Sequence, residues 1–220
     1  MGLTQRFDAA FQLASDLHLE RLARLWPPEC LIAPAPGADV LVLAGAIHRG
    51  LRAIEGFARW PVPVLYLAGN HEYYDGQWEQ LRTDLRRAAE GTAVRFLDND
   101  VVMLDGVRFL GSTLWTDYRL SGMPLSEAME AAEGFLLDHR RILTRSGPFR
   151  AAQALEEHLR SRDWRAVARQ PDTDGRHQPP CAASGFDSCA LRRQSGQRRV
   201  RQRSDRARRA TRLVVARPRA

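Results

Sequence analysis

The sequence predicts an α/β fold built on a mainly parallel sheet. Two apolar runs, DVLVLA at 39–44 and PVLYLA at 63–68, show no polar alternation, which is typical of strands buried on both faces. Residues 77–90 form an amphipathic pattern that places Trp78, Leu81 and Leu85 on one helical stripe. Because strands alternate with helices along the chain, we expect a parallel sheet with helices packed against it.

The remaining elements follow from the same patterns. They are strands at 10–15, 94–97, 101–104 and 107–110, and helices at 50–59, 125–143 and 150–162. Asp105 and Gly106, which separate the last two strands, are a strong signal for a hairpin turn. No internal repeat is visible.

Charge divides the chain into two parts. All 33 basic residues are Arg, and residues 165–220 hold 15 of them with 4 Asp, a net charge of +11. The preceding residues have a net charge of −4. We therefore predict one folded domain over 1–163 and an Arg-rich tail over 164–220. The best apolar cluster of the tail is only 213–215, so we expect the tail to be disordered by itself.

Composition also bears on location. No run approaches about 18 consecutive apolar residues, so no membrane span is expected. The first ten residues lack the long apolar stretch of a secretory signal. The three Cys are odd in number and have no metal-type spacing, which favours a reducing compartment. We expect a cytoplasmic protein that does not contact membranes.

Polar clusters follow three of the predicted strands. They are Asp-Leu-His at 16–18, Gly-Ala-Ile-His at 45–48 and Gly-Asn-His-Glu at 69–72. Ligands of open α/β sheets bind outside the carboxyl ends of the strands. Asp16 and His18 can reach one cation, Asn70 can add an oxygen, and His71 can approach the same point. Such oxygen and imidazole ligands suit Mn, Fe or Zn.

These motifs carry a family resemblance. FQLASDLHLE, DVLVLAGAIH and LYLAGNHEYY resemble the D-x-H, G-D-x-H and G-N-H-[DE] motifs of the calcineurin-like metallophosphoesterases. The run VRFLGSTLWTDYRL at 107–120 is similar to one bacterial branch of that family. The resemblance covers roughly residues 10–160.

The resemblance implies a four-layer α/β/β/α sandwich that holds two divalent metal ions, with Mn, Fe or Zn favoured. Those ions would clamp a phosphate mono- or diester and activate a water molecule for attack. Carried over by position, Asp16 and His18 would bind the first metal and Asn70 the second. His71 would be the catalytic acid, and Glu72 would orient the site rather than bind metal.

Two departures from the family pattern predict an impaired enzyme and an incomplete C-terminal side of the sandwich. Ala46 stands where the family has an Asp that bridges both metals, and a methyl group cannot bind metal. His48, a loop residue, does not compensate for it. The later His ligands of the family are also missing. The remaining candidates are His139 and His158, which we expect on helix surfaces, and His177, which no apolar strand precedes.

The tail has the composition of a GC-rich coding sequence read out of phase. With permitted synonymous codons, a shift by one base turns TDGRHQPP into PTVVTNHL, QRRVRQRSD into NAAFASDL and LVVARPRA into WWWHGHA. In order, these strings resemble the later His-bearing strand of the family, a helix, and the terminal G-H-x-H. We therefore predict a frameshift roughly between residues 163 and 173.

Two alternative functions stay open. The Arg-rich tail could bind nucleic acid non-specifically through phosphates, although it lacks the interleaved aromatic residues that stack on bases. The chain could also be a pseudoenzyme whose fold serves as a binding module. The nucleic-acid hypothesis leaves the strand-end motifs unexplained.

Overall fold

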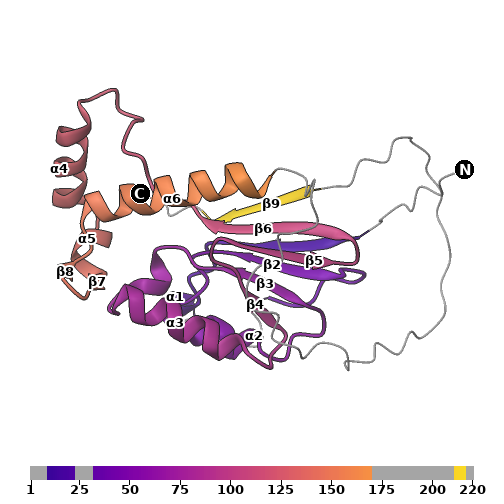
Figure 1. The fold of residues 1–220 in the computed structure, drawn as a ribbon. Coiled ribbons are helices and arrows are strands. Elements are labelled where there is room, and N and C mark those ends of the chain that lie inside the picture. Colours follow the sequence, from indigo (N-terminus) through magenta and orange to yellow (C-terminus); the bar gives the residue numbers. More distant parts are fainter. Residues whose placement is uncertain (1–8, 23–31, 170–210, 217–220) are drawn as a thin grey trace, which may run out of the picture.

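The first sheet is parallel and follows the order of the chain. The computed structural model of the protein describes residues 9–22, 32–169 and 211–216. The sheet consists of four adjacent strands, namely β1 (Phe11–Ala14), β2 (Val40–Ala44), β3 (Val64–Leu67) and β4 (Val94–Phe96). Every neighbouring pair is parallel (Figure 1). The prediction of an α/β fold with a mainly parallel sheet is confirmed to this extent.

The two central strands are buried on both faces, as their apolar runs predicted. One face packs on helices α2 (Arg52–Phe57) and α3 (Trp78–Ala89), and the other face packs on a second sheet. The residues facing the helices are Leu41, Leu43, Val64 and Tyr66, and those facing the second sheet are Val40, Val42, Leu65 and Leu67. Burial on both faces explains why neither strand alternates with polar residues.

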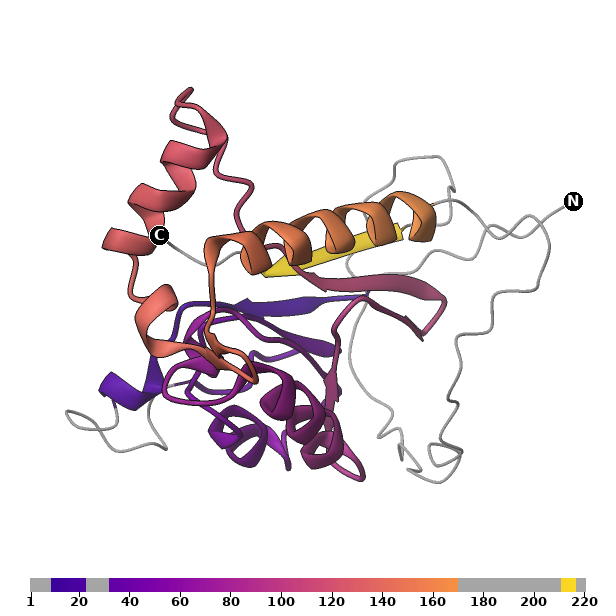
Figure 2. The same ribbon diagram turned by 60° about the vertical axis from the view of Figure 1, so that its left-hand side comes forward.

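The second sheet begins with the predicted hairpin. Strand β5 (Asp100–Leu104) pairs antiparallel with β6 (Val107–Thr113). Asp105 and Gly106 form its turn with positive φ angles of 47° and 75°, the backbone that a tight hairpin requires. Strand β9 (Thr211–Ala216) lies parallel to the other side of β6, and helix α6 (Ala151–Ala168) runs alongside these two strands (Figure 2).

Two pieces of the predicted tail are elements of this fold. Helix α6 continues through the boundary expected at 163 and ends at Ala168. Strand β9 contains the apolar run 213–215, the segment of the tail best suited to pair with a sheet. Both pieces differ from the expectation of disorder. The rest of the tail, with His177 and two of the cysteines, lies outside the described residues, and so does Cys30.

The single helix predicted over 125–143 is wrong. The structure has α4 (Leu125–Phe135), which extends away from the two sheets, and then a separate α5 (Asp138–Arg141) (Figure 1). Short strands β7 (Leu143–Thr144) and β8 (Gly147–Pro148) form a small hairpin after α5. The break falls at Leu136, whose backbone is extended, and it allows Asp138 to enter the protein interior.

The surface placement of two histidines also needs correction. His139, in α5, is buried, and its Nδ1 lies 2.7 Å from the carbonyl oxygen of Phe149. His158, in α6, is half-buried, with Nδ1 2.5 Å from the carbonyl oxygen of Trp115. A backbone carbonyl beside each imidazole satisfies a polar group that the helical pattern alone assigned to solvent. None of the helices in the described part of the chain is long and apolar enough to cross a membrane.

All four tyrosines are buried, and this makes alkaline unfolding a test of the fold. They are Tyr66, Tyr73, Tyr74 and Tyr118. Burial raises the pKa of each phenol above its ordinary value. Because the folded pKa exceeds the unfolded value of about 10, the phenols contribute stability below that pH and lose it as the pH rises further. We expect tyrosinate absorbance and tryptophan fluorescence to change in one cooperative transition above about pH 10. Gradual tyrosinate formation with unchanged fluorescence would contradict this packing.

Candidate metal centre

The loops that follow β1, β2 and β3 meet at one edge of the first sheet. The backbone N–H groups of Asp16, His18 and Leu19 donate to the carbonyl oxygens of Gly45, Ala46 and Ile47, at 3.0, 3.1 and 2.9 Å. The loop after β1 therefore runs hydrogen-bonded along the loop after β2. These hydrogen bonds place the first two strand-end motifs side by side.

Three residues of these loops adopt an unusual backbone. The φ angles of Asp16, His18 and Ala46 are 53°, 45° and 53°, in the left-handed region. Non-glycine residues are uncommon there, although Asp and His are found several-fold more often than most, and Ala has no such advantage. Such outliers cluster at functional sites, where the surrounding structure holds them in place. The conformation at position 46 therefore suits an Asp better than the Ala that this chain carries.

Glu72 joins the loops that follow β2 and β3 through hydrogen bonds. Its buried carboxylate accepts hydrogen bonds from the backbone N–H groups of Ala46 (3.1 Å), Ile47 (2.8 Å) and Gly69 (2.8 Å) and from the Tyr66 hydroxyl (3.1 Å). Burial raises the pKa of Glu72, and these hydrogen bonds partly oppose that effect. Both carboxylate oxygens are engaged, which agrees with the orienting role expected of this residue.

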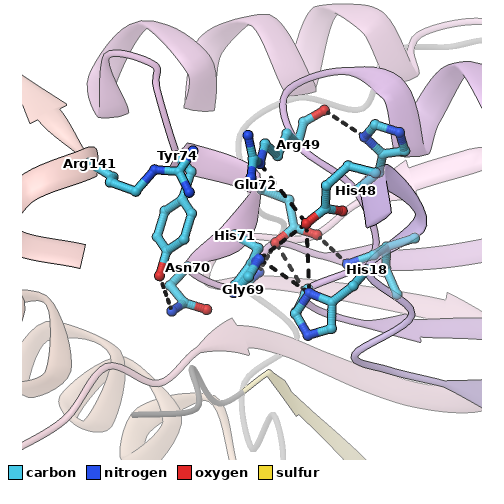
Figure 3. Close-up of polar contacts among 12 residues, drawn as sticks. His18, His48, Arg49, Gly69, Asn70, His71, Glu72, Tyr74 and Arg141 are labelled. Atoms are coloured by element: carbon cyan, nitrogen blue, oxygen red, sulfur yellow. Dashed lines mark hydrogen bonds and ion pairs between the residues drawn. The ribbon is translucent and has the colours of Figure 1, made fainter. Parts of the chain in front are cut away.

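A group of three potential metal ligands lies beside these loops. His18, Glu20 and His71 each offer one ligand atom, and the three atoms lie within 4.8 Å of one another. The two Nδ1 atoms are 3.1 Å apart, and Glu20 Oε1 lies 3.8 Å from that of His18 and 3.3 Å from that of His71. Figure 3 shows the two imidazoles converging. Two histidines and one carboxylate in this arrangement could hold a divalent transition-metal ion.

The surroundings of the group fit a cation. The second oxygen of Glu20, Oε2, is buried and has no hydrogen-bond partner among the described residues. A buried carboxylate oxygen left unpaired is costly, and coordination to a metal would satisfy it. Burial alone would raise the pKa of Glu20, but hydrogen bonds to its own backbone and to His71 outweigh burial, and the pKa lies below its ordinary value. Burial lowers the pKa of His71. Both shifts favour the deprotonated ligands that metals bind.

Asn70 lies next to His71 but outside this group. Its amide is buried, and Nδ2 donates to Asp138 Oδ1 at 2.8 Å and to the Tyr74 hydroxyl at 3.4 Å. Asn70 precedes a short 3₁₀ helix (His71–Tyr73), which turns the chain directly after the end of β3. This turn brings Asn70 and His71 to the same edge of the sheet as His18.

The site thus contains part of the predicted ligand set and one residue that was not predicted. His18 and His71 are brought together, whereas Asp16 is not a member of the group of three. Glu20 was missed, although it follows His18 by two residues in DLHLE, and the short helix α1 (Leu19–Leu22) turns it toward both imidazoles. A carboxylate spaced two residues after Asp-x-His was the available signal.

A pocket containing basic side chains adjoins the metal group. This open pocket of about 420 Å³ is lined by residues that include Glu20, His48, Arg49, Arg52 and Asp75. Arg49 lies 3.9 Å from Glu20 Oε1 and 3.1 Å from Asp75 Oδ2. His48 Nδ1 lies 3.2 Å from the Arg49 carbonyl oxygen, in a loop position as expected. The pocket therefore places two arginines and four carboxylates beside the metal-ligand set, and both arginines are paired with carboxylates of its lining.

Comparison with known proteins does not add to this picture. Neither a scan against protein-family models nor a search of curated proteins found a match to this chain. The strand-end motifs and the geometry of the site are therefore the basis on which its function is inferred.

Proposed function

We propose that this protein is a metal-dependent phosphoesterase that hydrolyses phosphate mono- or diesters. The observation that carries the proposal is the convergence of His18, Glu20 and His71 where the loops after β1 and β3 meet. The resemblance to calcineurin-like metallophosphoesterases supports the same reading and proposes their α/β/β/α sandwich for the two sheets and their helices. Imidazole and carboxylate ligands favour Mn, Fe or Zn.

The residues of the site can be given specific tasks. His18, Glu20 and His71 would hold one metal ion, and Asp16 and Asn70 are the further ligands that the resemblance proposes for a two-metal site. A divalent ion bound there would polarise the phosphoryl group and lower the pKa of a nucleophilic water. Arg49, in the adjoining pocket, would contact the anionic substrate by exchanging its present partner Asp75 for a phosphate oxygen.

His71 can serve both the metal and the leaving group. Its Nδ1 faces His18 and Glu20, so that Nε2 is the atom that remains for the substrate. A neutral imidazole that binds metal through Nδ1 keeps its proton on Nε2. His71 would donate a hydrogen bond from Nε2–H to the leaving-group or phosphoryl oxygen and so stabilise the charge that develops there, which is the form that the acid role proposed for it would take.

Ala46 is the reason to expect low activity. The position lies in the loop held by Glu72, beside the His18 backbone, and its methyl group offers no ligand atom. We therefore propose an impaired enzyme that retains one metal position built from His18, Glu20 and His71. The rest of the Arg-rich tail could still bind nucleic acid, but 170–210 lies outside the described residues, and no observation favours that function.

The full chain should be assayed with bis(p-nitrophenyl) phosphate and p-nitrophenyl phosphate, with and without Mn²⁺. We expect slow hydrolysis that requires the metal and that falls at least about 100-fold in Asp16→Ala and in His71→Ala. Asp163→Ala, which removes a surface carboxylate, is the matched control and should retain the activity.

Other outcomes separate the alternatives. Hydrolysis that does not depend on metal, or that survives Asp16→Ala and His71→Ala, would refute the proposal. Stable folding with no hydrolysis and no metal binding would favour the pseudoenzyme. Salt-sensitive binding of a DNA duplex without hydrolysis would favour a nucleic-acid-binding function of the tail.

A further inference from the structure

We infer that Asp138 is a positioning residue that fixes the orientation of the Asn70 amide, with Tyr74 as its partner. The inference rests on the proposed function, because it assigns Asn70 a carbonyl oxygen aimed at the metal edge. Asp138 lies on α5, outside all three strand-end motifs, and is 68 residues from Asn70 in the sequence.

The contact is buried and closely spaced. Asn70 is 2% exposed and Asp138 is 8% exposed. Asp138 Oδ1 accepts from Asn70 Nδ2 at 2.8 Å and from the Tyr74 hydroxyl at 2.6 Å. The same hydroxyl lies 3.4 Å from Asn70 Nδ2, so the three side chains form a closed triangle of polar contacts. Polar networks of this kind define a unique arrangement when they are satisfied in a buried site.

The two ends of the Asn70 amide differ chemically, so this contact determines which way the amide points. An Asn side chain has a donor end and an acceptor end, whereas an ionised carboxylate only accepts. Asp138 therefore selects the orientation in which the Asn70 NH₂ group points to α5. The carbonyl oxygen must then lie on the opposite side of the amide, and Figure 3 shows the Asn70 nitrogen on the side of the Tyr74 hydroxyl. We expect this orientation, and not the flipped one, to present an oxygen to a cation bound beside His71.

Tyr74 extends the same restraint to His71. The two rings are stacked, with centroids 4.5 Å apart and planes inclined by 29°. On α5, Arg141 lies over the Tyr74 ring at 4.7 Å and also pairs with Asp75. Helix α5 thus holds the loop of Asn70 and His71 at two points, Asp138 for the amide and Arg141 for the tyrosine ring. The broken helix at Leu136 is what makes these contacts available.

The test compares Asp138→Asn with wild type in the full chain. The substitution keeps the shape of the side chain but offers a donor as well as an acceptor, so the Asn70 amide can rotate. We expect Mn²⁺ affinity, measured by titration calorimetry, to fall about 10–100-fold while the melting temperature changes little. The double variant Asn70→Asp/Asp138→Asn restores a donor opposite an acceptor and should recover Mn²⁺ affinity. Asp163→Asn, with the same change of charge at the surface, is the control.

A second measurement does not need metal. The side-chain NH₂ signals of Asn70 in ¹⁵N NMR, assigned by their loss in Asn70→Asp, should exchange slowly in wild type and shift in Asp138→Asn. Unchanged signals would overturn the inference whether or not the protein binds Mn²⁺. If the signals shift in Asp138→Asn and the wild type binds no Mn²⁺, the result would support the orientation and refute the proposed function. If wild type and Asp138→Asn bind Mn²⁺ equally well, the positioning role of Asp138 is refuted and the proposed function is not.

Discussion

Glu72→Gln is expected to lower the free energy of unfolding by about 3–5 kcal/mol. The carboxylate accepts from three backbone N–H groups and from the Tyr66 hydroxyl, all in the interior. A glutamine amide would place its own NH₂ group against at least one of these donors. Chemical denaturation followed by tryptophan fluorescence would measure the loss.

A matched substitution separates this effect from a loss of charge in general. Glu55→Gln removes a carboxylate from an exposed pair with Arg52, and should change the free energy of unfolding by less than about 1 kcal/mol. If Glu72→Gln were as mild as Glu55→Gln, the carboxylate would not hold the loops after β2 and β3. The described geometry of the metal edge would then lack its main support.

Ala46→Asp is expected to tighten metal binding without restoring full turnover. The left-handed backbone at position 46 accepts Asp readily, and the new carboxylate would enter the edge that holds His18. The proposed frameshift withholds the later His ligands that the family resemblance implies. Full turnover should therefore require both Ala46→Asp and a tail read in the shifted frame, with a gain of about 100-fold or more over either change alone.

Four chains measured side by side would decide this point. They are the chain as it stands, Ala46→Asp, the frame-shifted chain and the combination, each assayed for Mn²⁺ affinity and phosphodiester hydrolysis. Full activity from Ala46→Asp alone would refute the frameshift hypothesis. DNA sequencing across codons 160–220 tests the same hypothesis directly, since the shifted strings must appear in one phase.

The two central strands were predictable because their burial on both faces produces an uninterrupted run of apolar residues in the sequence. The runs at 39–44 and 63–68 lack polar alternation, and the structure buries both faces of β2 and β3. Asp105 and Gly106 specified the hairpin through local backbone chemistry alone. His18 and His71 were predictable because parallel strands end at one edge of the sheet.

The rest of the site depends on contacts between distant segments. The pattern at 125–143 is continuously helical in the sequence, yet the chain breaks at Leu136 so that Asp138 can accept from Asn70 and Tyr74. Glu20 lies on the short helix α1 and reaches the two histidines from there. The contact of Asp138 with Asn70 has no local sequence signal and could be found only in the folded chain, whereas the spacing of Glu20 after Asp-x-His was the one signal for that residue.

The distance along the chain between Asn70 and Asp138 also orders events during synthesis. At a translation rate of about 5–20 residues per second, the last strand of the first sheet, β4, is complete about 2–8 s before Asp138 is added. A nascent chain can therefore carry the assembled parallel sheet, with His18, Glu20 and His71 in place, while the Asn70 amide still rotates freely. Metal binding that uses the Asn70 oxygen would thus follow the arrival of α5 rather than the formation of the sheet.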